Sequence, residues 1–294
     1  MDSFDSLVHT SDGRVLEVTT QGDPSGRTVF FHHGSPGTSN PSSHFDHVTS
    51  DVNLYVVSLS RPGYGASSRL KGRSVASVVA DVTTVLDELG REEYVAVGWS
   101  GGGPHALACA GLDQPRCRAA WSLAGVVPID VDFDWTAGMG PENLEEFALS
   151  LKGGPEYEAM IVRTGDEFAT ATPENIISSL GGLLSEVDKR ALDDVATRAV
   201  LATSFRHAFS SGCDGYYDDD RAFVTPWGFD PTAITVPVGV WYGDEDLMVP
   251  ASHGQWLGAN LASASVTHHA GEGHISLIVN HADELAIQFW RAFE

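Results

Sequence analysis

Short apolar runs alternate with longer amphipathic stretches over the first 125 residues of the chain. A short apolar run bounded by polar or turn residues predicts a β-strand. Such runs cover residues 14–20, 28–32, 54–59, 94–97 and 119–123. Between them, 74–89 carries apolar side chains every three or four residues and stops at Gly90, which predicts a helix, and a second helix is expected at about 102–112. Strands that alternate with helices predict an α/β fold with a mostly parallel central sheet and helices on both faces.

The alternation stops between about residues 128 and 228. Proline, glycine and charged residues interrupt the helical stretches of this segment, and no strand is predicted in it; the stretches are 144–151, 174–184 and 186–209. Strands return at 236–242 and 265–269, and a helix over 283–293 closes the chain. The sequence therefore predicts one core, formed by 1–127 and 229–294, with a helical cap or lid inserted at 128–228.

Composition and charge narrow the possible partners. The chain of 294 residues has 17 Lys and Arg against 40 Asp and Glu, a formal net charge of −23. Such a surface repels nucleic-acid phosphates and anionic membranes, so we expect neither as a partner. No segment approaches the roughly 18 to 20 apolar residues of a membrane span, and residues 1–10 do not resemble a signal peptide. The three cysteines are widely spaced, which favours free thiols and predicts a cytoplasmic protein. We expect its partner to be a small-molecule substrate.

The first candidate for chemistry is Ser100, in the sequence Gly-Trp-Ser-Gly-Gly at 98–102. This Gly-x-Ser-x-Gly pattern lies between a predicted strand and a predicted helix, and that context gives the pattern its meaning. A serine at so sharp a turn exposes its hydroxyl, and the helix N-terminus directs unpaired N–H groups toward an oxyanion formed beside it. Glycines are needed around it, because a Cβ would collide with the adjoining strand and helix.

A serine hydroxyl is a weak nucleophile at neutral pH and needs a base that is itself oriented by an acid. Asp246 follows the predicted strand 236–242, and His274 follows the strand 265–269. The order Ser, Asp, His and the positions at the carboxyl ends of strands suit this kind of sheet. Other acids and histidines compete for the same roles; they are Asp244, Glu245, His105, His268 and His269.

Taken together, these motifs make the chain similar to the α/β-hydrolase superfamily, in its serine-hydrolase branch. The resemblance also rests on His-Gly-Ser-Pro-Gly at 33–37, on Arg-Pro-Gly-Tyr-Gly at 61–65 and on Gly-x-Gly-His ending at His274. It covers essentially the whole chain, and it implies that the backbone N–H groups of Ser35 and Gly101 form the oxyanion hole. Trp99 is expected to pack near the nucleophile and to contact the substrate, whereas His32 and His33 are expected to be structural.

A metal or cofactor site has little support in the sequence. His44 and His47 have a spacing that would place both on one helix face, but no third ligand follows at a suitable distance. The glycines at 101–103 lack the spacing of nucleotide-binding loops. We expect no metal and no cofactor.

The predicted reaction is acyl transfer, with Ser100 attacking the carbonyl of an ester or lactone of a small apolar substrate. Relatives that open epoxides or displace halides use an aspartate in this position, so a serine argues against both reactions. One alternative is an aminopeptidase, because the loop at 33–37 resembles that of proline iminopeptidases, although Ser35 replaces their usual second glycine. Such an enzyme would need acids for the substrate ammonium, and the lid offers Glu142, Glu145, Glu146, Glu156 and Glu158. A lyase or cyclase that uses the same three residues, and a ligand-binding receptor, are further alternatives.

Substrate preference depends on how the lid folds over Ser100. Its aromatic side chains either line an apolar cavity or form the core of the lid; they are Phe133, Trp135, Phe147, Tyr157, Tyr216, Tyr217 and Trp227. The sequence does not give the oligomeric state.

Overall fold

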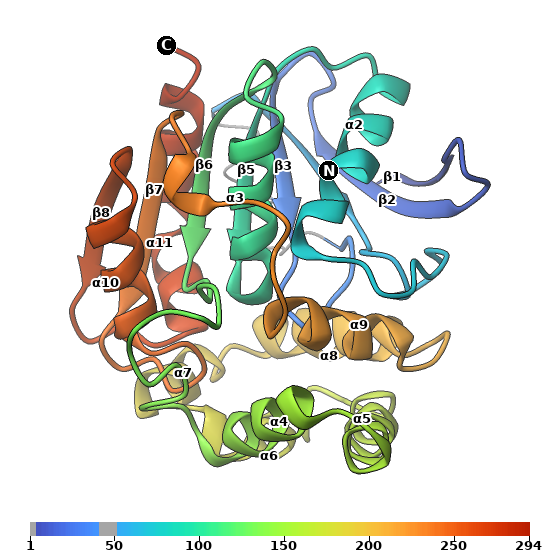
Figure 1. Ribbon diagram of the computed structural model, residues 1–294, viewed down its shortest axis with the longest axis vertical. Helices are drawn as coiled ribbons and strands as arrows, with labels where there is room; N and C mark the ends of the chain where they lie inside the picture. The colour runs from blue at the N-terminus through green and yellow to red at the C-terminus, as the bar shows by residue number, and fades with distance from the viewer. Residues whose placement is uncertain (1–3, 41–51) are drawn as a thin grey trace.

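A computed structural model describes residues 4–40 and 52–294 of the chain. Its centre is an eight-stranded sheet with the order β1-β2-β4-β3-β5-β6-β7-β8 (Figure 1). The strands are β1 (Phe4–His9), β2 (Val15–Gly22), β3 (Arg27–His32), β4 (Leu54–Leu59), β5 (Tyr94–Trp99), β6 (Cys117–Leu123), β7 (Val238–Gly243) and β8 (Ala264–His269). β2 pairs antiparallel with both β1 and β4, and every other pairing is parallel. The predicted mostly parallel α/β sheet is therefore confirmed.

Both faces of the sheet are buried along β4 and β5, which explains why these two strands are almost entirely apolar. In β5, Ala96 points into a core shared with α2 (Val78–Glu88), α3 (Gly103–Leu112) and α10 (Ala251–Asn260). Its neighbours Val95 and Val97 point to the opposite core, which α11 (Ser276–Arg291) covers. Successive side chains of a strand face opposite ways, and the strands from β3 to β7 contribute to both cores. Figure 1 shows α3 in front of the strands and α11 behind them.

The segment between β6 and β7 is helical, as predicted. Every residue of 124–237 is described, and none of them lies in a strand. The helices are α4 (Pro141–Lys152), α5 (Pro155–Phe168), α6 (Ile176–Leu180), α7 (Glu186–Ala191), α8 (Val195–Ala208) and α9 (Asp214–Phe223). They form a layer beyond the carboxyl ends of β3 and β6 (Figure 1). The layer has its own apolar core, which includes Phe168, Ile176 and Phe205.

Several elements differ from those predicted. The single stretch expected over 186–209 is two helices, because the Asp194 side chain accepts a hydrogen bond from the Thr197 N–H and caps a new helix there. The helix expected over 174–184 ends at Leu180, where Gly181 takes a φ of +52°. The closing helix begins at Ser276 rather than 283 and has a kink at His281. The strand β1 and the helices α5, α9 and α10 were not predicted.

No helix among the described residues is long and apolar enough to cross a membrane.

Candidate active site

The turn after β5 holds Ser100 in a strained conformation. Its φ is +56°, in the left-handed region that residues with a Cβ rarely adopt. A Cβ added at Gly98 would collide with the carbonyl oxygen of Gly102, and one added at Gly102 would collide with that of His32. The glycines of the Gly-x-Ser-x-Gly pattern are therefore required by close packing of β5, the turn and β3.

His274 and Asp246 lie together at the carboxyl ends of β8 and β7. The imidazole Nδ1 is 2.8 Å from Asp246 Oδ2, and both side chains are buried. The other carboxylate oxygen accepts hydrogen bonds from the backbone N–H groups of Met248 and Val249, each at 2.8 Å. Burial disfavours the imidazolium, but the negative charges of Asp246 and Asp188 outweigh it and raise the pKa of His274 above its usual 6.5.

The competing acids and histidines lie elsewhere. Asp244 accepts a hydrogen bond from the Gly271 N–H at 2.6 Å, and Glu245 is exposed. His105 is buried on α3 with its Nδ1 2.8 Å from the carbonyl oxygen of Gly101. The last two, His268 and His269, belong to β8.

Ser100 and His274 line one cavity of about 260 Å³, together with Ser35, Gly101 and Trp99. The loop that carries Ser35 lies directly against the turn at Ser100. A Cβ added at Gly101 would lie 2.5 Å from Ser35 Oγ, and one added at Gly34 would lie 3.4 Å from Ser100 Cβ. The structure thus brings the predicted nucleophile, the predicted base and the two predicted oxyanion donors to one place.

A buried ion pair holds the loop of Ser35. The Arg61 guanidinium donates hydrogen bonds to the carbonyl oxygens of His33 and Gly34, at 2.6 and 2.9 Å. It also pairs with Asp219 of α9 at 2.7 Å, and the Ser35 hydroxyl donates to the same carboxylate at 2.5 Å. The expectation that His33 is structural agrees with its burial in this arrangement.

Asp219 remains ionised although it is fully buried. Burial alone would raise its pKa, but Arg61 and Arg73 hold that pKa well below the usual range. Sequence reasoning missed this residue, because Asp-Asp-Asp at 218–220 is too short to count as a biased segment.

A second carboxylate of the helical segment, Asp188 of α7, holds the loop of His274. It accepts hydrogen bonds from the backbone N–H groups of His274, Ile275 and Ser276, at 3.1, 2.8 and 3.0 Å. A Cβ added at Gly273 would collide with this carboxylate, which explains the glycine before His274. The sequence does not indicate this contact. Asp188 binds backbone N–H groups, which every residue except proline carries, so its partners need no particular side chain.

Trp99 lies in the cavity wall and also supports His274. Its indole N–H donates to the carbonyl oxygen of His274 at 3.2 Å, and the two ring centroids are 5.2 Å apart. Trp99, which the sequence predicts to contact the substrate, therefore also has a structural contact with His274.

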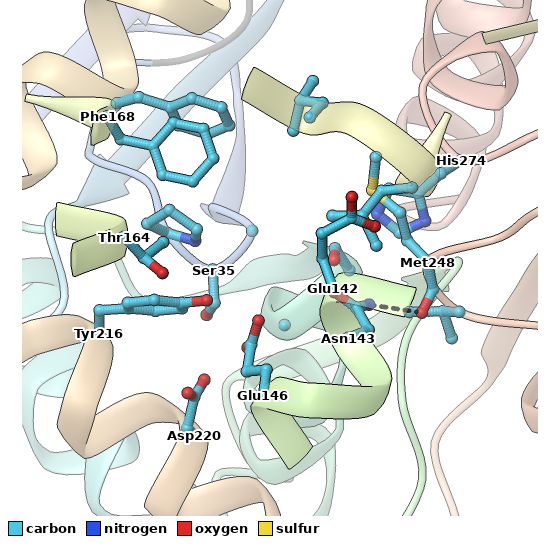
Figure 2. A pocket seen from close by; sticks show the side chains of 18 of the residues that line it. Ser35, Glu142, Asn143, Glu146, Thr164, Phe168, Tyr216, Asp220, Met248 and His274 are labelled. Atoms are coloured by element: carbon cyan, nitrogen blue, oxygen red, sulfur yellow. Dashed lines mark hydrogen bonds between the residues drawn. The ribbon is translucent and has the colours of Figure 1, made fainter. Parts of the chain in front are cut away.

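The helical segment supplies most of the remaining cavity wall (Figure 2). Of the aromatic side chains considered from the sequence, Phe147 and Tyr216 line the cavity, whereas Trp135 and Trp227 pack in the core beside the sheet. Other residues of the segment in the wall are Glu142, Glu145, Glu146, Met160, Arg163, Phe168 and Asp220. The wall is thus apolar in part and acidic in part.

The candidate metal ligands His44 and His47 lie outside the described residues. Within 4–40 and 52–294, no group of three or more His, Cys, Asp or Glu side chains is arranged to hold a metal ion.

Comparison with known proteins supports the same fold. A family model described as "alpha/beta hydrolase fold" matches residues 27–148. A non-heme haloperoxidase of Rhodococcus erythropolis is 26% identical over 276 residues, which cover 89% of this chain and 86% of that protein. Epoxide hydrolase B of Mycobacterium tuberculosis is 35% identical over 136 residues, 45% of this chain and 34% of that protein. The solved structure of an α/β-hydrolase fold protein from Nakamurella multipartita superposes with a TM-score of 0.69 at 21% identity, covering 99% of this chain and all (100%) of that one. The chain therefore has the α/β-hydrolase fold, and its segment 27–148 matches the family model.

Proposed function

We propose that this protein is a serine hydrolase that cleaves an ester or lactone through an acyl-enzyme on Ser100. The observation that carries the proposal is the strained turn of Ser100, which opens on the same cavity as the buried His274–Asp246 pair. Backbone strain at a residue with a Cβ is typical of functional sites, where the surrounding structure holds it in place. A serine, rather than an aspartate, at this turn favours acyl transfer over epoxide opening.

The reaction begins when the imidazole of His274 takes the proton of Ser100 Oγ as that oxygen attacks the substrate carbonyl. Asp246 fixes the imidazole tautomer and stabilises the imidazolium. The backbone N–H groups of Ser35 and Gly101 bind the oxyanion, a contribution of about 3 kcal/mol for each donor. The C–O bond then breaks, and the imidazolium gives its proton to the leaving alkoxide.

Water completes the cycle. His274 takes a proton from a water molecule, the resulting hydroxide attacks the acyl carbon, and Ser100 leaves with the proton that His274 returns. The helical segment 128–228 acts as the cap that selects the substrate, since its side chains form most of the cavity wall opposite Ser100.

The experiment is hydrolysis of short 4-nitrophenyl esters together with labelling by a serine-reactive fluorophosphonate. We expect turnover and labelling at Ser100, and loss of both in Ser100→Ala. Ser178→Ala is the matched control, because this serine is exposed on α6 and its hydroxyl only donates to the carbonyl oxygen of Asn175. Labelling without turnover of any ester, lactone or amide would replace the proposal with a lyase or cyclase. Absence of both would indicate a binding protein.

A further inference from the structure

Two carboxyl groups face each other in the cavity wall, Glu146 of α4 and Asp220 of α9 (Figure 2). Asp220 is completely buried, and Glu146 is half-buried. Glu146 lies beside Asp220 and Tyr216 in this wall (Figure 2). The Tyr157 hydroxyl donates to Asp220 Oδ2 at 3.2 Å.

This pair has no cationic partner among the described residues, unlike the two aspartates that precede it. Asp218 pairs with Arg69 at 2.7 Å, and Asp219 pairs with Arg61, also at 2.7 Å. By contrast, the buried Oδ1 of Asp220 finds no hydrogen-bond donor in the part of the chain that the structure describes. Burial raises the pKa of both carboxyls, and the negative charge of Glu146 raises that of Asp220 further, which favours a proton held by the pair.

The wider cavity also carries an excess of negative charge. Its acidic lining residues are Glu142, Glu145, Glu146, Glu167 and Asp220. Among the described lining residues, Arg163 is the one Lys or Arg, and it is bound to Glu145 at 2.9 Å. A concave site lined by one sign of charge concentrates ligands of the opposite sign.

We propose that Glu146 and Asp220 bind a primary ammonium group of the substrate. The inference rests on the proposed function, because the pair shares the cavity of Ser100, and it narrows the substrate to an ester, lactone or amide that carries an amine. An ammonium has three N–H donors and no acceptor, which suits two carboxylates and the unsatisfied Oδ1 of Asp220. When it binds, the shared proton of the pair leaves to solvent.

A hard metal cation fits this position less well. Ca²⁺ and Mg²⁺ take six or more oxygen ligands, mainly carboxylates, carbonyls and water. The pair offers only two carboxyl groups, and the Tyr157 hydroxyl beside it acts as a donor toward Asp220.

The test uses 4-nitrophenyl butyrate as a neutral reporter and compares n-pentylamine with n-pentanol as competitors. The two molecules have nearly the same size, and only the amine is charged at pH 7.5. We expect pentylamine to inhibit at least tenfold more strongly than pentanol. Asp220→Asn should bring the ratio of inhibition by pentylamine to inhibition by pentanol close to one. Glu146→Gln, at a less buried position, should do the same. Glu156→Gln removes one charge from an exposed position of the same helical segment, outside the cavity, and should leave the ratio unchanged.

Calorimetric binding of pentylamine to the Ser100→Ala protein separates this inference from the proposed function. Ester hydrolysis with equal inhibition by amine and alcohol would overturn the amine site and leave the hydrolase intact. Pentylamine binding that needs Asp220 and Glu146, with no hydrolysis by the wild-type protein, would overturn the hydrolase alone. Binding of Mg²⁺ or Ca²⁺ that depends on the pair and excludes pentylamine would assign the site to a metal instead.

Discussion

Asp188 accepts a hydrogen bond from the backbone N–H of His274 at 3.1 Å, although the two residues are 86 positions apart in the chain. The same carboxylate binds the next two N–H groups, which begin α11. A negative charge at a helix N-terminus satisfies donors that have no partner within the helix. The helical segment 128–228 therefore holds the loop of the proposed base, in addition to covering the cavity.

Replacing Asp188 with asparagine should lower both the activity and the pKa of His274. The amide keeps one acceptor oxygen but loses the charge that favours the imidazolium. We expect kcat/KM for an ester to fall about tenfold and the acidic limb of its pH profile to move to lower pH. Asp193→Asn, at an exposed position just after α7, is the control. A normal rate with an unshifted pH profile would exclude the role given to Asp188.

The pH dependence of the wild-type protein follows from the direction of the same pKa. His274 must be neutral to accept the Ser100 proton, and its pKa is raised above 6.5. Activity should therefore be low at acidic pH and rise through a pKa above 6.5. Measurement of kcat/KM between about pH 5 and pH 9 checks this. A profile that is already flat below pH 6.5 would contradict it.

Loss of one member of the Arg61–Asp219 pair should affect both stability and catalysis. Both side chains are completely buried, so Asp219→Asn leaves the guanidinium without its counter-charge. Breaking a buried pair in this way costs about 3 to 5 kcal/mol, and we expect kcat to fall as the loop of Ser35 loosens. Urea unfolding and ester hydrolysis measure the two effects. Asp214→Asn removes an exposed pair with Arg69 and should change stability by less than about 1 kcal/mol.

Backbone strain at Ser100 should lower the free energy of unfolding by a measurable amount. Ser100→Gly removes the Cβ that makes a φ of +56° unfavourable, whereas Ser100→Ala keeps it. Both variants lack the hydroxyl and should be inactive. We expect the glycine variant to be more stable than the alanine variant by about 1 kcal/mol in thermal or urea unfolding. Equal stability would mean that the turn stores no strain.

The parts of the fold and site that are encoded locally were predictable from the sequence. The strand before Ser100 is a short apolar run, and the glycines around it are needed by the turn itself. Asp246 and His274 follow strands directly, and parallel strands bring their carboxyl ends to one edge of the sheet. Their positions follow from the order of the elements.

Other parts depend on contacts between distant segments. Asp219 and Ser35 are 184 positions apart, and no periodicity relates them. The break between α7 and α8 was missed for a different reason. The helical pattern continues across it, and only the capping side chain of Asp194 separates the two helices.

The anchoring contacts of Asp188 and Asp219 have a consequence for protein engineering. Exchanging the segment 128–228 for that of a relative is a natural way to alter substrate range. In this chain the exchange would also remove the anchors of both loops, at His274 and at Ser35. A functional chimera would need a donor segment with acids at the same two places, so specificity and turnover cannot be redesigned independently.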